Sequence, residues 1–266
     1  MSGARLSQYL SGRYKGDVES LDTRAEVYLA REEQKLREPL TRLKFCETSA
    51  YRKMEETLDT AYIEGDIAVV VGSSGVGKTV GAEHYCLEHP DCVFIDCDPS
   101  FTVRVLVNEI LHKLGTQPCG TIHVAMEQII QRLAGTGRMI VIDEAEHLSY
   151  RSLEIIRRIH DKTEIGLCLC GMQRLIENLR GGGQYQQLYS RIGVFCDLRT
   201  LEPNDIETIL DQISASKETK HTLLASAKGN ARTLQKLLKR TERLAKINGT
   251  EMTPEIVQKA EELLMV

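Results

Sequence analysis

Hydrophobic residues between positions 67 and 198 come in short runs that do not alternate with polar ones. Polar or helix-patterned stretches separate these runs, which are IAVVVG (67–72), CVFIDCD (92–98), RMIVIDE (138–144), IGLCLCG (165–171) and GVFCDL (193–198). Strands that are buried on both faces of a parallel sheet need such continuous runs rich in Val and Ile. We therefore predict an α/β core with about five parallel strands.

The pattern changes after Leu201, where no further strand-like run occurs. Apolar residues recur at helical spacing over 202–213, 220–247 and 253–264. In the last stretch, Thr253 followed by Pro254 is typical of a helix N-cap and first turn. The sequence predicts a small all-helical lid domain over residues 202–266, which follows an α/β core over residues 41–201.

Residues 1–40 are predicted to form a separate helical appendage. Apolar residues recur at helical spacing among charged ones over 20–38, and Pro39 interrupts the pattern. Residues 2–17 carry three basic side chains before the first acid, Asp17, and have the character of the second helix of a helix-turn-helix without its first. A lone helix of this length cannot bury its apolar side. We expect it to pack on the 20–38 helix or to be disordered.

Composition narrows the class of protein. A chain of 266 residues with 42% hydrophobic content can bury a sizeable core. No apolar run approaches the roughly 20 residues of a membrane span, and the polar start lacks the apolar segment of a signal peptide. We expect a cytoplasmic protein with no membrane partner. The eight cysteines include no CxxC pair, so we interpret them as reduced core thiols rather than zinc ligands.

The formal net charge of -4 argues against a protein whose whole surface binds nucleic acid. Phosphate affinity comes from clustered Lys and Arg, and one local cluster does occur between Lys228 and Lys246, where the only acid is Glu242. A solvated helix face is the alternative interpretation of this stripe. The residues predicted to contact DNA phosphates are Lys236, Lys239 and Arg240.

The segment GSSGVGKT, residues 72–79, matches the phosphate-binding loop pattern and lies between a predicted strand and a predicted helix. Its glycines let backbone N–H groups point at the β-phosphate, with the positive end of the following helix behind them. Lys78 is expected to contact the β- and γ-phosphates, and Thr79 to ligate Mg²⁺. A glycine-rich turn without a ligand is the alternative. The predicted ATP contacts are Gly72, Ser73, Ser74, Gly75, Val76, Gly77, Lys78, Thr79 and Val80.

An acidic motif, DEAEH, closes the predicted strand 138–144. Ligands of open α/β sheets bind at the carboxyl ends of strands, so Asp143 is placed to hold Mg²⁺ through its water shell. Glu144 is placed to orient and polarise the water that attacks the γ-phosphate. The adjacent Asp-Glu pair favours ATP hydrolysis over phosphoryl transfer to a substrate. We interpret Glu146 and His147 as helix-start residues rather than catalytic ones.

Two arginines outside these motifs are candidates for nucleotide contact. Arg191 precedes the last predicted strand, from which it cannot easily reach the phosphates bound by its own loop. We predict that it acts as an arginine finger on a neighbouring subunit's nucleotide, with a surface ion pair as the alternative. Arg232 is predicted to fold over the nucleotide of its own subunit, with a DNA-facing or solvated arginine as the alternative.

The order of these parts resembles that of the AAA+ ATPases: phosphate loop, Asp-Glu strand, a strand ending LCG, an SRI arginine and a helical lid with GNAR. Among the AAA+ ATPases, the chain is similar to the transposition-helper family of phage Mu, its prophages and related transposons. The similarity covers nearly the whole chain, and the stretches that carry it are ESLDTRAEVYLAREEQ, IAVVVGSSGVGKT, MIVIDEAEHL, IGLCLCGMQR and LYSRI.

The resemblance implies an ATP-dependent, largely sequence-independent DNA-binding ATPase that assembles as a helical filament on duplex DNA. It also implies delivery of target DNA to a cognate transposase, which stimulates hydrolysis and disassembly. For DNA contact inside such a filament, the segment after the second predicted strand offers Arg104. By position, nucleotide-site roles carry over to Lys78, Thr79, Asp143, Glu144, Arg191 and Arg232.

The sequence departs from the family pattern in two places. Met172 occupies the position of a polar residue that senses the γ-phosphate in relatives. Gln173 beside it is the predicted substitute, and the alternative is that the sensor is absent and basal hydrolysis is weak. The helix-turn-helix domain of relatives is also longer, and residues 2–17 match only its later part.

Two other functions fit the same motifs. A helicase loader or replication initiator has the same core but serves a helicase instead of a transposase. A nucleotide-switch signalling ATPase has this core too, but binds protein partners and no DNA.

Overall fold

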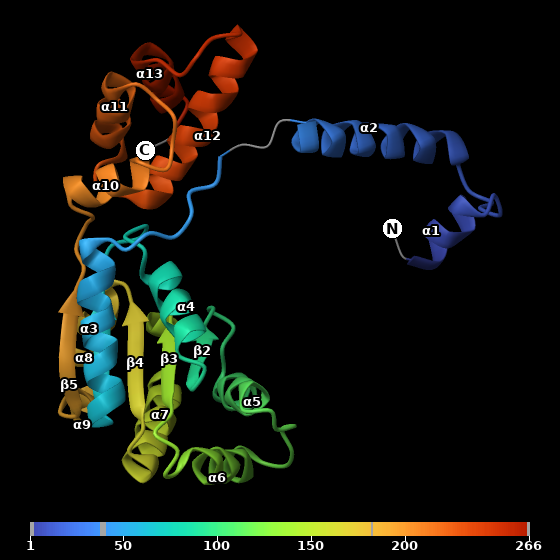
Figure 1. Ribbon diagram of the computed structural model, residues 1–266. Helices are drawn as coiled ribbons and strands as arrows, with labels where there is room; N and C mark the ends of the chain where they lie inside the picture. Colours follow the sequence, from blue (N-terminus) through green and yellow to red (C-terminus); the bar gives the residue numbers. More distant parts are fainter. Residues whose placement is uncertain (1–2, 38–40, 182, 265–266) are drawn as a thin grey trace. The chain divides into compact units, whose positions relative to one another are not determined.

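The computed structural model describes residues 3–37, 41–181 and 183–264, which group into two compact units, Met1–Thr41 and Arg42–Val266 (Figure 1). The first unit contains helices α1 (Gly3–Leu10) and α2 (Val18–Arg37). The Tyr9 hydroxyl donates a hydrogen bond to the Asp22 carboxylate, so α1 contacts α2. The apolar side of α1 nevertheless stays open, because no residue of this helix is buried.

The second unit is built on a five-stranded parallel sheet with the order β2-β3-β4-β1-β5. This confirms the predicted α/β class with its five parallel strands. The strands are β1 (Ile67–Val71), β2 (Cys92–Asp96), β3 (Met139–Asp143), β4 (Gly166–Gly171) and β5 (Ile192–Asp197).

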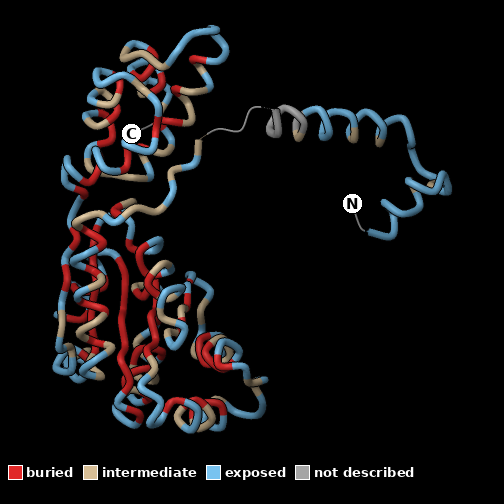
Figure 2. Tube along the Cα trace, in the orientation of Figure 1, coloured by how far each residue is buried: buried red, intermediate tan, exposed pale blue. Residues whose placement is uncertain are grey.

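Burial explains why the strand runs do not alternate. Every residue of β1, β3 and β4 is buried, since these three strands are central and covered on both faces (Figure 2). The edge strands β2 and β5 instead mix buried, half-buried and exposed positions. An unbroken apolar run therefore indicates that a strand is central in the sheet, in addition to indicating that the segment is a strand.

Helices pack on both faces of the sheet through two hydrophobic clusters. One cluster joins the sheet to α5 (Val103–Lys113), α6 (Ile122–Leu133), α7 (Tyr150–Thr163) and α8 (Gln173–Arg180). The other joins it to α3 (Ser49–Glu64), α4 (Lys78–Glu88) and the C-terminal helices. Short segments complete the core: the 3-10 turns η1 (Ala145–His147) and η2 (Gly183–Tyr185), and helix α9 (Gln186–Tyr189).

The C-terminal region is all-helical, as predicted, with α10 (Pro203–Leu210), α11 (Lys217–Ala227), α12 (Ala231–Asn248) and α13 (Pro254–Glu262). The boundary between core and lid at residues 201 and 202 stays a prediction, because Leu201 and buried lid residues belong to one hydrophobic cluster with the sheet. No helix among the described residues is both long enough and apolar enough to cross a lipid bilayer.

The stretch predicted as helix over 220–247 is interrupted, which corrects the sequence interpretation. Lys228 and Gly229 both have positive φ, 49° and 71°, and such residues end a right-handed helix. Asn230 then caps α12, because its Oδ1 accepts a hydrogen bond from the Thr233 amide at 2.9 Å. Thr253 is the N-cap of α13, but its side chain makes no capping hydrogen bond.

The described cysteines are all free thiols. Cys97, Cys168, Cys170 and Cys196 are buried in the core, whereas Cys119 is exposed and departs from the predicted location. No group of three or more metal-ligating side chains occurs in the described part of the chain.

Candidate active site

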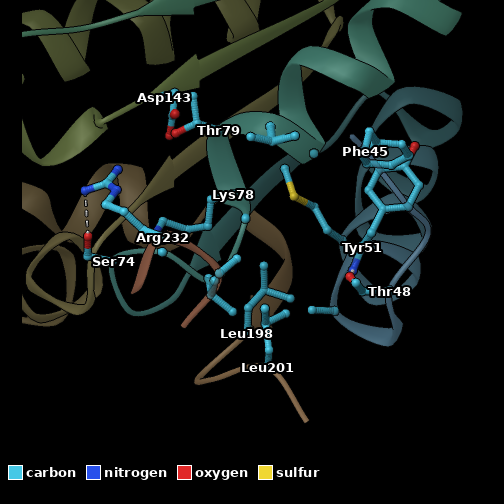
Figure 3. A pocket seen from close by; sticks show the side chains of 18 of the residues that line it. Phe45, Thr48, Tyr51, Ser74, Lys78, Thr79, Asp143, Leu198, Leu201 and Arg232 are labelled. Atoms are coloured by element: carbon cyan, nitrogen blue, oxygen red, sulfur yellow. Dashed lines mark hydrogen bonds between the residues drawn. The ribbon is translucent and has the colours of Figure 1, made fainter. Parts of the chain in front are cut away.

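A cavity of about 370 Å³ opens at the carboxyl edge of the sheet, between the phosphate loop and the lid (Figure 3). Its polar wall comes from residues 74–81 and from the ends of β3 and β4. The ends of β1, β4 and β3 meet here because these strands are neighbours and parallel. This is the location at which open α/β sheets bind ligands.

The phosphate loop depends on two glycines with positive φ. Gly75 has φ 82° and Gly77 has φ 103°, which are conformations that side chains other than glycine rarely adopt. Gly77 precedes α4 without a side-chain cap, so the helix presents backbone N–H donors to the loop. The positive end of α4 therefore favours an anion in this part of the cavity.

Lys78 lies beneath the loop, where 8% of it is exposed. Its Nζ donates hydrogen bonds to the carbonyl oxygens of Gly72 at 2.7 Å and Ser73 at 3.1 Å. Burial lowers the pKa of its ammonium group, and the negative charges of Asp143 and Glu146 oppose that shift. The ammonium is thus held at the loop by carbonyl groups, without a paired carboxylate in contact.

Two carboxylate oxygens near this lysine have no hydrogen-bond partner among the described residues. Asp143 is 1% exposed, and its Oδ2 atom is buried without a hydrogen bond. The Oε2 atom of Glu146 is also buried without a hydrogen bond. Thr79 lines the cavity with both acids (Figure 3). Hydrated Mg²⁺ prefers hydroxyl and carboxylate oxygens, so this donor set fits the ion and its water shell would satisfy both orphan atoms.

Glu144 also lines the cavity, together with its partner His147. Its backbone is left-handed, with φ 51°, and its carboxylate pairs with His147 Nε2 at 3.5 Å. This non-glycine residue in a strained conformation lies directly after Asp143. Backbone strain of this kind is concentrated at functional sites.

Glu146 is a site residue that sequence reasoning missed. It lies in the short η1 turn, as predicted, yet its Oε1 also accepts the Met172 amide at 3.1 Å. The carboxylate therefore joins the end of β3 to the end of β4 and lines the cavity. The sequence does show Glu146 as a third acid in the DEAEH motif. The order of the strands is needed to show that its carboxylate reaches the Met172 amide.

The lid contacts the phosphate loop through the segment that precedes and begins α12. Asn230 Nδ2 donates to the Ser74 carbonyl at 2.7 Å, and Arg232 Nη1 donates to Ser74 Oγ at 3.1 Å (Figure 3). The Ala231 amide adds a bond to the Gly75 carbonyl at 2.9 Å. Arg232 thus reaches the loop of its own chain, and Asn230 is a contact that we did not predict.

The opposite wall of the cavity is apolar. It is contributed by the segment before α3, by α3 itself and by residues at the start of the lid. The segment before α3 is tied to the lid, because Gln235 Oε1 accepts the Leu43 amide and Gln212 Oε1 accepts the Lys44 amide, each at 2.8 Å. This wall suits a flat apolar ring, and its side chains include Leu43, Phe45, Tyr51, Met54, Leu198, Leu201 and Ile209.

Three predicted ATP contacts do not line the cavity. Gly72 and Ser73 lie at the base of the loop, where their carbonyls accept from Lys78. Gln173 begins α8, is exposed, and lies outside the cavity, whereas Met172 lines it. Met172 and Glu146, rather than Gln173, therefore occupy the end of β4 in this chain.

Arg191 lies away from the cavity. It precedes β5, and because β5 is parallel to β1, its position is at the amino edge of the sheet, opposite the phosphate loop. Its Nε donates to Asp161 Oδ1 at 2.5 Å, and its Nη1 donates to the Gln187 carbonyl at 3.2 Å. Within one chain it makes an ion pair, which was the alternative to the arginine finger.

The candidate DNA contacts lie on two helices. Arg104 is in the first turn of α5, exposed, and bound to the Gly120 carbonyl through Nη1 at 3.3 Å. On α12, Lys236 is exposed and Lys239 is half-buried, while the Arg240 guanidinium donates to the Leu263 carbonyl. Spacings of four and three residues place one set of cations along a single face of α12: Arg232, Lys236, Lys239, Arg243 and Lys246.

Comparisons with known proteins agree with this arrangement. Residues 64–179 match the AAA domain family. The chain is 30% identical over 227 residues to the ATP-dependent target DNA activator B of Escherichia phage Mu, covering 82% of this chain and 72% of that protein. It is 28% identical over 215 residues to the Mu-like prophage FluMu DNA transposition protein B of Haemophilus influenzae, covering 79% of this chain and 75% of that one.

Among solved structures, the ORC2 protein of Aeropyrum pernix, in its ADPNP-ADP complexes, superposes with a TM-score of 0.63 at 17% identity. The match covers 80% of this chain and 66% of the ORC2 chain, and at this identity it supports the fold alone.

Proposed function

The chain belongs to the family of the phage Mu ATP-dependent target DNA activators B, and on that premise we propose that it is a DNA-binding ATPase of DNA transposition. The AAA domain and the family together make it an ATP-using protein with the AAA ATPase fold. The finer proposal is that it binds duplex DNA largely without regard to sequence, assembles on it with ATP, and recruits or activates a transposase.

Hydrolysis is assigned to the polar wall of the cavity. Lys78 exchanges its two carbonyl partners for the β- and γ-phosphate oxygens of ATP. Thr79 and Asp143 would hold Mg²⁺, which neutralises charge on the phosphates. Glu144 leaves His147, orients a water molecule and accepts its proton as the water oxygen attacks the γ-phosphorus. The bond to the β-phosphate oxygen breaks, and the products are ADP and phosphate.

The apolar wall is the proposed place of the adenine ring. The amides of Leu43 and Lys44 are bound to lid glutamines, which holds this segment of the wall in place. Flat apolar side chains such as Phe45 and Tyr51 exclude water from that side of the cavity. Bound ATP would then touch the core and the lid at once.

Arg191 is proposed to act on the nucleotide of a neighbouring subunit. It lies at the sheet edge opposite its own phosphate loop and is half-exposed. Exposed apolar side chains flank it in the sequence, with Tyr189 and Phe195 each 42% accessible. An arginine set among exposed apolar residues suits a subunit interface, which supports assembly of several copies.

The contact of α12 with the phosphate loop is the observation that carries the proposal. Arg232 is the first cation of the basic face of α12, and it also bonds Ser74 of the loop. A change in the loop on ATP binding is therefore transmitted to the helix that presents Lys236 and Lys239. This arrangement supports DNA affinity that depends on ATP, with the phosphate backbone as the ligand. Arg104 on α5 stays a separate proposed DNA contact.

The test is binding to a fluorescent duplex with ATP, with ADP and without nucleotide, followed by imaging of the same samples by electron microscopy. We expect affinity to rise with ATP and oligomers to appear on the DNA only under that condition. No binding at low salt with ATP would contradict the proposal and favour a protein-binding signalling ATPase. Stimulation of a helicase rather than of a cognate transposase would favour a helicase loader.

A further inference from the structure

The guanidinium of Arg191 is fixed on two of its nitrogens by its own chain. Asp161 on α7 accepts from Nε, and the carbonyl of Gln187 in α9 accepts from Nη1. Neither contact uses Nη2. The side chain is thus held in one orientation, while one terminal N–H₂ group has no acceptor among the described residues.

Asp161 is itself held by a second arginine. Arg157, which is 9% exposed, donates from Nη1 to the Asp161 carboxylate. Arg157 is anchored in turn by Glu154, which accepts from Nε at 3.1 Å and from Nη2 at 3.0 Å. The three side chains follow the three- and four-residue spacing of one helix face on α7. The helix backbone and a largely buried arginine therefore fix the carboxylate.

The charges in this network allow Arg191 to bind a further anion without leaving Asp161. Arg157 and Arg191 share the Asp161 carboxylate, so this charge stays paired while Nη2 of Arg191 contacts a phosphate. A long arginine side chain loses rotamer freedom when it is fixed in one geometry. Here that freedom is already restricted before any neighbouring subunit arrives.

We propose that Asp161 is a positioning residue, which holds Arg191 in the orientation that serves the triphosphate of a neighbouring subunit. The inference rests on the proposed function, because it requires Arg191 to act across a subunit interface. The inference adds to that function because the orientation of Arg191 is assigned to a carboxylate on α7. An ordinary exposed ion pair would affect only the stability of the fold.

The experiment measures DNA-stimulated ATP hydrolysis of Asp161→Asn at protein concentrations that give full assembly. We expect kcat to fall about tenfold, because a misplaced catalytic group costs rate and not substrate affinity. KM for ATP should be unchanged, since the phosphate loop and Lys78 of the neighbouring subunit still bind the nucleotide. In Asp161→Glu the charge is kept but displaced by one methylene group, so kcat should fall less than in Asp161→Asn.

Two controls separate positioning from fold stability. Lys162→Gln removes an ion pair between α7 and Glu127 but leaves the contacts of Asp161 and Arg191, so its kcat should stay near the unmodified value. Thermal unfolding midpoints of all variants show whether each is folded. In the double variant with Arg191→Ala, Asp161→Asn should cause no further loss, because the residue acts only through that arginine.

The outcomes distinguish this inference from the proposal beneath it. If Arg191→Ala hydrolyses ATP normally when assembled, the arginine finger is wrong and the inference falls with it. If Arg191→Ala is defective but folded Asp161→Asn and Asp161→Glu both keep full kcat, the finger stands and the positioning role is overturned. An additive loss in the double variant would also overturn it.

Discussion

Asn230 Nδ2 donates a hydrogen bond of 2.7 Å to the main-chain carbonyl of Ser74, which joins the lid to the phosphate loop. The same side chain caps α12 through its Oδ1. One residue therefore fixes both the start of the basic helix and its distance from the loop. A change that separates Asn230 from the loop should therefore weaken both the cap of α12 and the attachment of the lid to the loop.

Gly75→Ala should displace the lid from the loop. A Cβ at this position would lie 2.2 Å from Asn230 Oδ1, and φ of 82° would strain any side chain. We expect ATP affinity to fall at least about tenfold, equivalent to about 1.4 kcal/mol, as measured by titration with a fluorescent nucleotide. Gly249→Ala is the matched control, since its φ is 64° and no heavy atom lies within 4 Å of the new Cβ. That control should lose stability by about 1–2 kcal/mol but keep its ATP affinity.

Arg232→Ala should weaken the coupling of nucleotide to DNA. The variant lacks the bond to Ser74 Oγ but keeps the Asn230 cap, so the helix itself should remain folded. We expect a smaller gain in DNA affinity on addition of ATP, measured by fluorescence anisotropy. Lys236→Ala, one turn further along the same face, controls for the loss of one positive charge. Equal coupling in the two variants would contradict a specific role for Arg232.

Glu144→Gln should bind ATP and fail to hydrolyse it. The glutamine keeps the size of the side chain beside His147, but its amide cannot take the proton of the attacking water. We expect kcat to fall by a factor of about 10²–10⁴. We also expect long-lived protein–DNA complexes with ATP, and the rate of dissociation from DNA measures their lifetime. Normal hydrolysis in this variant would remove Glu144 from the proposed mechanism. Glu146→Gln would then be the next variant to measure, because Glu146 is another acid of the motif that lines the cavity.

Asp143→Asn should raise the Mg²⁺ concentration needed for hydrolysis. Asp143 Oδ2 is buried without a partner, and an amide would replace that anionic oxygen by a weaker ligand or by a donor. We expect the half-saturating Mg²⁺ concentration to rise about tenfold or more, in assays titrated from EDTA-treated protein. An unchanged Mg²⁺ dependence would show that this carboxylate does not hold the ion.

Neutralising Lys236, Lys239 and Arg240 together should flatten the salt dependence of DNA affinity. Each phosphate contact that is lost lowers the slope of log K against log salt by about 0.9. We expect Arg240→Gln alone to contribute least, because its guanidinium is bound to the Leu263 carbonyl. The control is Lys217→Gln with Lys259→Gln, two exposed lid lysines outside this face. An unchanged slope in the triple variant would make the stripe a solvated helix face.

Much of the fold followed from local pattern. The strand runs predicted β1, β3 and β4 because all their side chains are buried, which leaves no polar alternation to obscure them. The break between α11 and α12 was missed, although Gly229 and Asn230 are residues that often end or cap helices. Apolar spacing continues through that break, so the periodic pattern alone could not show it.

For the candidate site, the sequence predicted the loop and Arg232 of the lid, but not Asn230. Glycine spacing and the following Lys-Thr pair identify residues 72–79, since the loop is made by consecutive residues. Glu146 escaped detection because its partner, the Met172 amide, comes from the end of a different strand. Gln173 was chosen as the substitute sensor because it follows Met172 in the chain, yet the start of α8 leaves it exposed.

The sequence by itself determined the parallel α/β class, the phosphate loop and the carboxylates beside it, because each depends on residues that are close together in the chain. Tertiary structure alone decided that Asn230 and Arg232 touch Ser74 and that Asp161 holds Arg191. Those contacts depend on strand order and on the packing of the lid against the core, and no local pattern encodes either. The chemistry of this protein is therefore set by short motifs, whereas the coupling of that chemistry to the lid and to neighbouring subunits is set by packing.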